Sequence, residues 1–314
     1  MPSVSLIKPK TLRPGDTFRL VSPASPITPE QIQKFATMME DAGFGLTIAD
    51  HAFAKDHYLA GSDEARARDL QAAFADERVD AVICTRGGYG CARLMPYLDL
   101  DAIAGAGKMF LGFSDITTLH LALNRRGLPT VHAPVALTFS VEREPWVHDS
   151  FFSVLAGRRP IPEQAPKGVT LVPGTAEGVV TGGCLCLLTD SIGTSDALNC
   201  EGKIVLIEDV DENPHRIDAM LTHLLLTGTI QRAAGIVVGE MTRTDEKADE
   251  SIGGRPWREI VRDRLGSLDV PIITDFPFGH CKNMLTLPLG IRARLDANDG
   301  SLTYLESICD ILGV

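Results

Sequence analysis

The strongest constraint on the fold lies in residues 108–127, which read KMFLGFSDITTLHLALNRRG. A short apolar run at 109–111 precedes the turn GFSD, and apolar residues then recur at helical spacing until Gly127. This pattern predicts a strand, a sharp turn that carries Ser114, and a helix. Such a turn exposes a hydroxyl and directs backbone N–H groups toward a reacting group. The match to G-x-S-x-G is partial, because Ile116 replaces the second glycine, and Ser114 could instead be a helix N-cap.

The N-terminal half repeats the same alternation of short apolar runs and longer amphipathic segments. Strands joined by helices of 10 to 15 residues are typical of a mainly parallel sheet with right-handed crossovers. We therefore expect an α/β fold. The predicted strands are residues 18–21, 46–48, 81–84, 109–111 and 129–132, and the predicted helices include 29–42 and 62–75.

The pattern changes after about residue 150, where prolines and glycines crowd the chain. This composition predicts a linker over 161–173. It separates an N-terminal α/β domain, 1–160, from a smaller, mixed and more strand-rich domain, 174–314. The last part of that second domain reads as a hairpin around Asn298, Asp299 and Gly300.

The composition excludes several classes of function. The formal net charge is −11 and no cluster of Lys and Arg stands out, which argues against a nucleic-acid partner. No run of 18 apolar residues predicts a membrane span, and the first residues lack the apolar core of a signal peptide. We therefore expect a cytoplasmic protein. Any anionic substrate would need local positive charge to offset the overall field.

The cysteines and histidines do not follow a metal-binding pattern. There are seven cysteines without a C-x-x-C pair, and the eight histidines show no H-E-x-x-H spacing. We expect reduced, mostly buried thiols, no metal site and no cofactor. The cysteines are Cys84, Cys91, Cys184, Cys186, Cys200, Cys281 and Cys309.

Three residues with complementary chemistry each follow a predicted strand: Ser114, Glu208 and His280. Ligand sites in α/β proteins gather at the carboxyl ends of strands. A serine hydroxyl needs a neutral imidazole to take its proton, and the imidazole needs a carboxylate to orient it. Each residue also has a simpler interpretation. Glu208, in IEDVDE, could be a solvated carboxylate, and His280, in FPFGHCKN, could be a loop histidine bonded to backbone.

The segment 86–90, RGGYG, is a glycine-rich loop between a predicted strand and a predicted helix. It matches neither the P-loop nor the dinucleotide-binding fingerprint. It indicates a place where the backbone approaches a ligand closely and could supply oxyanion-hole N–H groups. Arg86 could clamp a substrate carboxylate. The alternative is a plain tight turn.

Taken together, five stretches in register resemble the LD-carboxypeptidases, serine peptidase family S66, which also contains the microcin C immunity proteins. The resemblance implies a triad of Ser114, Glu208 and His280, with an oxyanion hole formed by backbone N–H groups of Asp115 and Gly88. The stretches are LRPGDTFRLVSPAS, TRGGYGCARLMPYLD, LGFSDITTLHLAL, IEDVDENPHRIDAMLTHL and FPFGHCKNMLTLPLG.

The same resemblance implies an N-terminal domain similar to class I glutamine amidotransferases, a small β-rich C-terminal domain and a homodimer. The implied reaction removes the terminal D-alanine of a murein tetrapeptide during cell-wall recycling. One departure bears on substrate choice, since Cys184 stands in GGCL where the family often has Asn. His215 likewise occupies a position that is often aromatic.

Two other functions remain open at this point. A microcin-immunity-like hydrolase would use the same triad on the amide of a peptidyl or aminoacyl nucleotide, and would need an aromatic platform for the base. Trp146 and Trp257 are the only tryptophans. A non-catalytic binding protein on the same scaffold is a third reading, although all three residue types of the triad are present.

Overall fold

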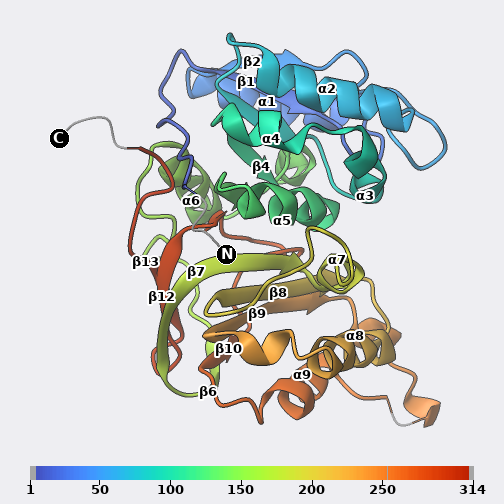
Figure 1. Ribbon diagram of the computed structural model, residues 1–314, viewed down its shortest axis with the longest axis vertical. Helices are drawn as coiled ribbons and strands as arrows, with labels where there is room; N and C mark the ends of the chain where they lie inside the picture. The colour runs from blue at the N-terminus through green and yellow to red at the C-terminus, as the bar shows by residue number, and fades with distance from the viewer. Residues whose placement is uncertain (1–4, 253, 311–314) are drawn as a thin grey trace. The chain divides into compact units, whose positions relative to one another are not determined.

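The computed structural model describes residues 5–252 and 254–310, which divide into two units (Figure 1). The chain passes between the units more than once, because two late segments return to the first unit. Of the described residues, unit 1 comprises 5–162, 286–290 and 307–310, and unit 2 comprises the remainder.

Unit 1 contains the predicted alternation of strands and helices. Its strands are β1 (Thr17–Val21), β2 (Gly45–Ile48), β3 (Ala81–Cys84), β4 (Met109–Gly112), β5 (Thr130–His132) and β11 (Leu287–Leu289). Its helices are α1 (Pro29–Asp41), α2 (Asp63–Ala75), α3 (Cys91–Leu94), α4 (Leu100–Gly105), α5 (Thr117–Arg125) and α6 (Pro145–Leu155). Its 3-10 turns are η1 (Met95–Tyr97), η2 (Ser114–Ile116) and η3 (Ala136–Ser140).

The first helices begin where the sequence supplies caps. Before α1, the backbone N–H of Thr28 donates to the side chain of Gln31 at 3.0 Å, and Pro29 opens the first turn. Before α2, the Ser62 hydroxyl accepts from the backbone N–H of Ala65 at 3.3 Å. These local bonds satisfy donors that a helix leaves unpaired at its start.

The sheet of unit 1 has the order β11-β5-β4-β3-β1-β2. Strands β1 to β5 are parallel to one another, and β11 pairs antiparallel with β5. Right-handed crossovers then require α1 on one face of the sheet and α2 to α5 on the other. The predicted parallel-sheet architecture of the N-terminal half is confirmed.

Aromatic side chains pack around α1 and, separately, around α2. Phe35 of α1 lies 5.8 Å from Phe139 of η3 and 6.4 Å from Phe151 of α6, between ring centroids. In the other group, Phe110 of β4 lies 5.8 Å from Phe74 of α2. Such pairs add about 0.5–1.5 kcal/mol each beyond the burial of their area. Aromatic packing is therefore present on both faces of the sheet.

The strand order reverses between β1 and β3, and the candidate site residues of unit 1 lie near this reversal. Two loops leave the carboxyl ends of these adjacent strands, namely the segment 22–28 after β1 and the glycine-rich segment 86–90 after β3. In open α/β sheets, ligands bind where the strand order reverses, outside the carboxyl ends of the strands. The turn with Ser114 follows β4, the next strand of the sheet.

Unit 2 contains a second, mixed sheet. Its strands are β6 (Val169–Val172), β7 (Thr175–Cys184), β8 (Ile204–Val210), β9 (Gly235–Thr242), β10 (Ile272–Thr274), β12 (Arg292–Asp296) and β13 (Ser301–Tyr304). Its helices are α7 (Leu185–Asp190), α8 (Pro214–Leu226) and α9 (Trp257–Leu265), with 3-10 turns η4 (Ile230–Arg232), η5 (Asp245–Lys247) and η6 (Glu250–Ile252).

The second sheet has the order β13-β12-β7-β8-β9-β10-β6, with a parallel centre from β7 to β10 and antiparallel pairs at both edges. Helix α8 packs against α7 and α9 (Figure 1). The predicted hairpin near the C-terminus is confirmed as β12 and β13. Strand β6 lies in the segment 161–173 that was predicted as a linker. It is a four-residue edge strand that pairs with β10, and the nearby prolines make its sequence resemble a loop.

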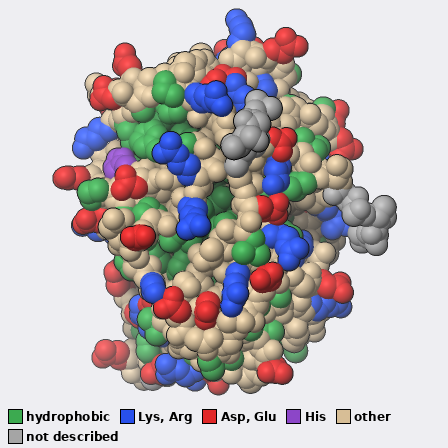
Figure 2. Space-filling model, turned by 90° about the vertical axis from the view of Figure 1, so that its left-hand side faces the viewer, with side chains coloured by type: hydrophobic (Ala, Val, Ile, Leu, Met, Phe, Trp, Pro, Cys, Tyr) green, Lys and Arg blue, Asp and Glu red, His purple; other side chains and the backbone are tan. Residues whose placement is uncertain are grey.

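The surface agrees with an ordinary charged composition. Acidic and basic side chains are interspersed over the face drawn in Figure 2. Among the described helices, none has the length and apolar character that crossing a bilayer requires.

Candidate active site

Ser114 lies on a strained turn directly after β4. It is the first residue of η2, and its φ of 66° is a left-handed conformation that non-glycine residues adopt at a cost of about 1–3 kcal/mol. The N-cap of η2 is Phe113 and that of α5 is Ile116, so Ser114 caps neither helix. A Cβ on Gly112 would lie 2.8 Å from the Ile116 side chain, which explains the glycine before the turn.

The glycine-rich loop meets this turn. A Cβ on Gly87 would lie 2.7 Å from Ser114 Cβ and 3.0 Å from its Oγ, so only glycine fits there. Gly88 has a φ of 116°, and a Cβ there would collide with the Ser25 side chain. Ser25 holds the loop, since its hydroxyl accepts from the Tyr89 N–H at 3.2 Å and its N–H donates to the Gly87 carbonyl at 3.4 Å.

Two buried charged side chains brace the same region. The Asp115 carboxylate accepts from the Cys91 N–H at 2.8 Å, which ties the serine turn to α3, and burial raises the pKa of this carboxyl. The guanidinium of Arg66, 1% exposed, donates to the Gly90 carbonyl at 3.1 Å and to the Pro23 carbonyl. Sequence reasoning missed Arg66, because an arginine in an amphipathic helix normally points to solvent.

Arg86, the predicted carboxylate clamp, lies at the start of the glycine-rich loop and is half-buried. Its Nη1 donates to the Pro26 carbonyl at 3.3 Å, whereas its buried Nε has no hydrogen-bond partner among the described residues. A guanidinium with spare donors in a partly desolvated place can bind a carboxylate strongly.

Glu208 and His280 are joined in unit 2. His280 Nδ1 lies 2.7 Å from Glu208 Oε2, and the His280 backbone N–H donates to the same oxygen at 3.2 Å. A carboxylate only accepts hydrogen bonds, so Nδ1 carries the proton and the lone pair of the neutral ring is on Nε2. Glu208 is fully buried. The burial of Glu208 contradicts its interpretation as a solvated carboxylate.

The backbone of unit 2 explains this contact. The β8–β9 ladder is shifted opposite Glu208, and such irregularities redirect side chains near sites. Gly239 of β9 lies in the shifted stretch, where a Cβ would come within 2.8 Å of the Phe278 carbonyl oxygen. Gly279 has a φ of 86°, and a Cβ there would collide with the Glu208 carboxylate. Two glycines thus let the histidine loop approach Glu208 closely.

The environment of His280 favours its charged form. Burial opposes the charge, but the charge and hydrogen bond of Glu208, with smaller contributions from Asp209 and Asp211, outweigh it and raise the pKa of His280 above 6.5. The imidazole is therefore a stronger base than in a model peptide.

Unit 2 also contains a cluster of potential metal ligands, which was not expected from the sequence. Cys184 at the end of β7, Cys186 in α7 and Asp209 in β8 place one ligand-type atom each within 4.8 Å of the others. Burial and the charge of Glu208 raise the pKa of Asp209 to about 6. The signal in the sequence is the C-x-C pair, which has neither the C-x-x-C spacing nor the histidine spacing of common metal motifs.

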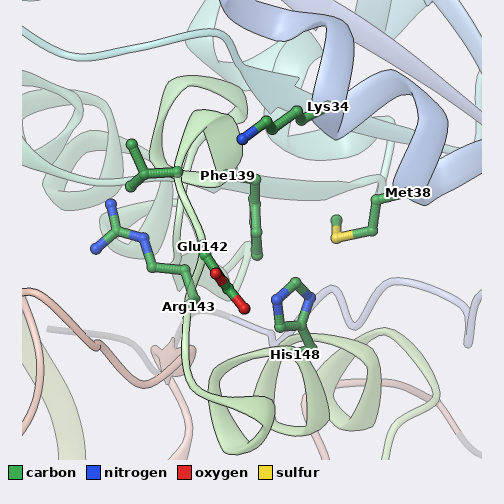
Figure 3. Close-up of a pocket in the computed structure, with 7 residues that line it drawn as sticks. Lys34, Met38, Phe139, Glu142, Arg143 and His148 are labelled. Atoms are coloured by element: carbon green, nitrogen blue, oxygen red, sulfur yellow. The ribbon is translucent and has the colours of Figure 1, made fainter.

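Unit 1 also has a surface pocket of about 340 Å³, at which Phe139 is surrounded by side chains of α1, α6 and the segment after η3 (Figure 3). Its lining includes none of the site residues predicted from the sequence. The lining residues are Lys34, Met38, Phe139, Val141, Glu142, Arg143 and His148.

The predicted site residues therefore fall into two groups. Arg86, Gly88, Ser114 and Asp115 share the strand ends of unit 1. Glu208 and His280 form a hydrogen-bonded pair in unit 2. The first group contains a hydroxyl and backbone N–H groups, and the second is an imidazole hydrogen-bonded to a buried carboxylate.

Comparison with known proteins identifies the family. Residues 18–133 match the LD-carboxypeptidase N-terminal domain of peptidase family S66, and residues 177–295 match the LD-carboxypeptidase C-terminal domain. The chain belongs to this family and is a hydrolase that acts on peptide bonds.

Individual relatives span nearly the whole chain. A Streptomyces coelicolor protein named "Putative carboxypeptidase SCO6489" is 38% identical, over 95% of this chain and 96% of its own length. The murein tetrapeptide carboxypeptidase of Pseudomonas aeruginosa is 32% identical, over 89% of this chain and 92% of its own. The crystal structure of an MccF-like protein from Bacillus anthracis matches with a TM-score of 0.84 and 26% identity, covering 95% of this chain and 99% of that one.

Proposed function

We propose that the protein is a serine LD-carboxypeptidase that removes a C-terminal D-amino acid from a murein tetrapeptide, with Ser114 as nucleophile, His280 as general base and Glu208 as the carboxylate that orients it. The observation that carries this proposal is the 2.7 Å contact of His280 Nδ1 with a fully buried Glu208. Such a contact leaves Nε2 as the basic nitrogen.

The proposed reaction has two steps. His280 Nε2 takes the hydroxyl proton as Ser114 Oγ attacks the peptide carbonyl, and it then gives that proton to the leaving amine of the D-amino acid. Water then attacks the acyl-enzyme. His280 Nε2 takes a proton from this water and gives it to Ser114 Oγ as the ester bond breaks. Backbone N–H groups of Asp115 and Gly88 stabilise the oxyanion in this proposal. The left-handed turn at Ser114 and the packing of Gly87 against it support a backbone-built oxyanion hole there.

Arg86 is the proposed partner of the substrate's terminal carboxylate. A carboxypeptidase must hold that carboxylate in a protein whose formal net charge is −11. The half-buried position of Arg86 at the start of the glycine-rich loop supports the assignment. The planar fork of arginine binds both carboxylate oxygens, which lysine does not reproduce.

The likeness to an MccF-like structure supports a second candidate, a hydrolase of peptidyl- or aminoacyl-nucleotide amides. MccF is the name of the microcin C7 self-immunity protein of Escherichia coli. The same three catalytic residues would serve this reaction, but the substrate would present a nucleotide where the tetrapeptide presents a D-amino acid with its free carboxylate. Substrate therefore separates the two candidates, whereas mutation of the triad does not.

The decisive experiment is a panel of tri-, tetra- and pentapeptides with D- or L-alanine at the C-terminus, assayed beside an aminoacyl sulfamoyl adenosine. We expect cleavage of the tetrapeptide with terminal D-alanine and slow turnover of its L-alanine counterpart. Preferential hydrolysis of the nucleotide analogue would transfer the assignment to the immunity-type reaction. Both candidate functions would be contradicted if this protein hydrolysed none of these substrates while a known family member, assayed in parallel, cleaved its own.

The family resemblance supports three further proposals. The N-terminal domain is similar to class I glutamine amidotransferases, in keeping with a nucleophile on a strand-to-helix turn of a parallel sheet. The protein acts in the cytoplasm, where a murein peptide would be recycled. It forms a homodimer, which light scattering after size-exclusion chromatography would test.

A further inference from the structure

Cys184, Cys186 and Asp209 form a compact set of metal-ligand side chains in unit 2. Cys184 Sγ lies 3.4 Å from Cys186 Sγ and 3.5 Å from Asp209 Oδ1. The strand register explains the proximity, since Cys184 of β7 pairs with Glu208 of β8, next to Asp209. Cys186 comes from the first turn of α7, which follows β7 directly.

The distances suit a tetrahedral divalent cation. Zinc bonds of about 2.3 Å to sulfur and about 2.0–2.2 Å to oxygen place the ligand atoms of a tetrahedron roughly 3.5–3.8 Å apart. The two distances to Cys184 Sγ are 3.4 and 3.5 Å, and all three ligand atoms lie within 4.8 Å of one another, so rotation of the side chains would complete the geometry. Two sulfur ligands favour a thiophilic ion such as Zn²⁺ over Mg²⁺ or Ca²⁺.

The surroundings hold the carboxylate and leave a path to it. The Cys186 N–H donates to Asp209 Oδ2 at 2.9 Å, and the Val210 N–H donates to Oδ1 at 2.7 Å. Hydrogen bonds of this kind hold a metal-binding carboxylate in its orientation. Cys184 and Asp209 are 2% and 1% exposed, whereas Cys186 is partly exposed. An ion could therefore enter past Cys186, and water could fill a fourth position on that side.

We propose that Cys184, Cys186 and Asp209 bind one thiophilic divalent cation, with Zn²⁺ as the reference ion and water as the fourth ligand. Binding forms two zinc–sulfur bonds and one zinc–oxygen bond, and the two thiol protons pass to solvent. Two thiolates and one carboxylate carry three negative charges, so the dication leaves a net charge of −1 at the site. This proposal does not depend on the catalytic role of Ser114 or on the substrate.

The test is a titration of the reduced, chelator-washed full-length protein with Zn²⁺, and with Co²⁺ as a spectroscopic probe. We expect one Zn²⁺ per chain with an apparent Kd of about 1 µM or tighter, and a sulfur-to-cobalt charge-transfer band with the intense visible bands of tetrahedral Co²⁺. Zinc should also protect Cys184 and Cys186 from alkylation, as read by peptide mass spectrometry.

Matched variants locate the ion. Cys186→Ala removes a partly exposed side chain and should weaken binding by at least about 100-fold while the circular dichroism spectrum stays unchanged. Asp209→Asn keeps the shape and should also weaken binding. Cys200→Ala, at a buried thiol of the same unit outside the cluster, should bind as wild type does.

Three outcomes would overturn the proposal. These are an absence of stoichiometric binding up to about 100 µM Zn²⁺, binding that survives Cys186→Ala, and alkylation of Cys184 and Cys186 in the reduced protein at a rate that saturating Zn²⁺ does not change. Because the wild-type titration and the alkylation pattern need no variant, a misfolded mutant would not leave the question open.

Discussion

The two units hold their candidate catalytic groups by different physical means. Unit 1 presents Ser114 through backbone geometry, with a left-handed φ and the glycine at 87 packed against the serine side chain. Unit 2 presents His280 through side-chain contact with a carboxylate that is fully buried. The position of the Ser114 hydroxyl is thus sensitive to atoms added near the turn, and the His280 imidazole is sensitive to charge and hydrogen bonding.

The largest expected effect is loss of the nucleophile itself. Ser114→Ala should lower kcat by about 10⁴-fold or more, because the reaction then lacks its covalent step. Turnover of the tetrapeptide would be measured beside the urea midpoint, which should not fall. Near-normal turnover by this variant would show that the strained serine has another purpose and that the mechanism is wrong.

The substrate carboxylate comes next. Amidating the C-terminus of the tetrapeptide should cost about 2–4 kcal/mol, or roughly 30- to 1,000-fold in kcat/KM, as expected when a desolvated charge loses its partner. Arg86→Lys should lower activity on the free acid and reduce the penalty for amidation. Equal kcat/KM on both peptides with the wild type would mean that no carboxylate clamp exists.

A matched pair of alanine substitutions probes the comparison directly. Gly87→Ala would push a Cβ against Ser114, and Gly279→Ala would push one into the Glu208 carboxylate, so each should lower kcat/KM by about 100-fold through displacement of a catalytic group. Gly105→Ala in unit 1 and Gly228→Ala in unit 2 are controls, because a Cβ at either position meets open space. Gly228 also has a positive φ, of 69°, so it controls for backbone strain.

The outcome can separate the two units. A loss with Gly279→Ala but not with Gly87→Ala would mean that the serine turn tolerates displacement and that only the histidine loop is under tight constraint. Equal activity of both variants and their controls would contradict the close packing on which this comparison depends.

The smallest expected effect is a shift of pH dependence. His280 must be neutral to accept a proton, and its pKa is raised, so kcat/KM should fall as pH falls through a value above 6.5, about tenfold per pH unit below it. Glu208→Gln removes the negative charge and weakens the hydrogen bond that raise the pKa of His280, so the acidic limb should move to lower pH. It should also cost less activity than Ser114→Ala.

A pH–rate profile of kcat/KM for the wild type and Glu208→Gln tests this expectation. Activity that stays flat down to about pH 5 would argue against a histidine base. A limb that keeps its position in Glu208→Gln would show that Glu208 does not set the basicity of His280.

Local sequence patterns predicted much of the fold. The alternation of apolar runs and amphipathic segments was sufficient for the parallel sheet of unit 1, because strand and helix periodicities are short-range. The Asn298-Asp299-Gly300 turn predicted the β12–β13 hairpin for the same reason. The edge strand β6 escaped prediction, since its partner β10 is distant in sequence and its proline-rich flanks resemble a linker.

The candidate residues show the same division. Sequence alone placed Ser114, Glu208 and His280 after apolar runs, and the family motifs assigned their roles. Only the tertiary structure decided that Glu208 is buried against His280, because that contact depends on an irregular β8–β9 ladder and on Gly279. It alone also joined Cys184, Cys186 and Asp209, since parallel pairing of β7 with β8 is a long-range choice that no local pattern encodes.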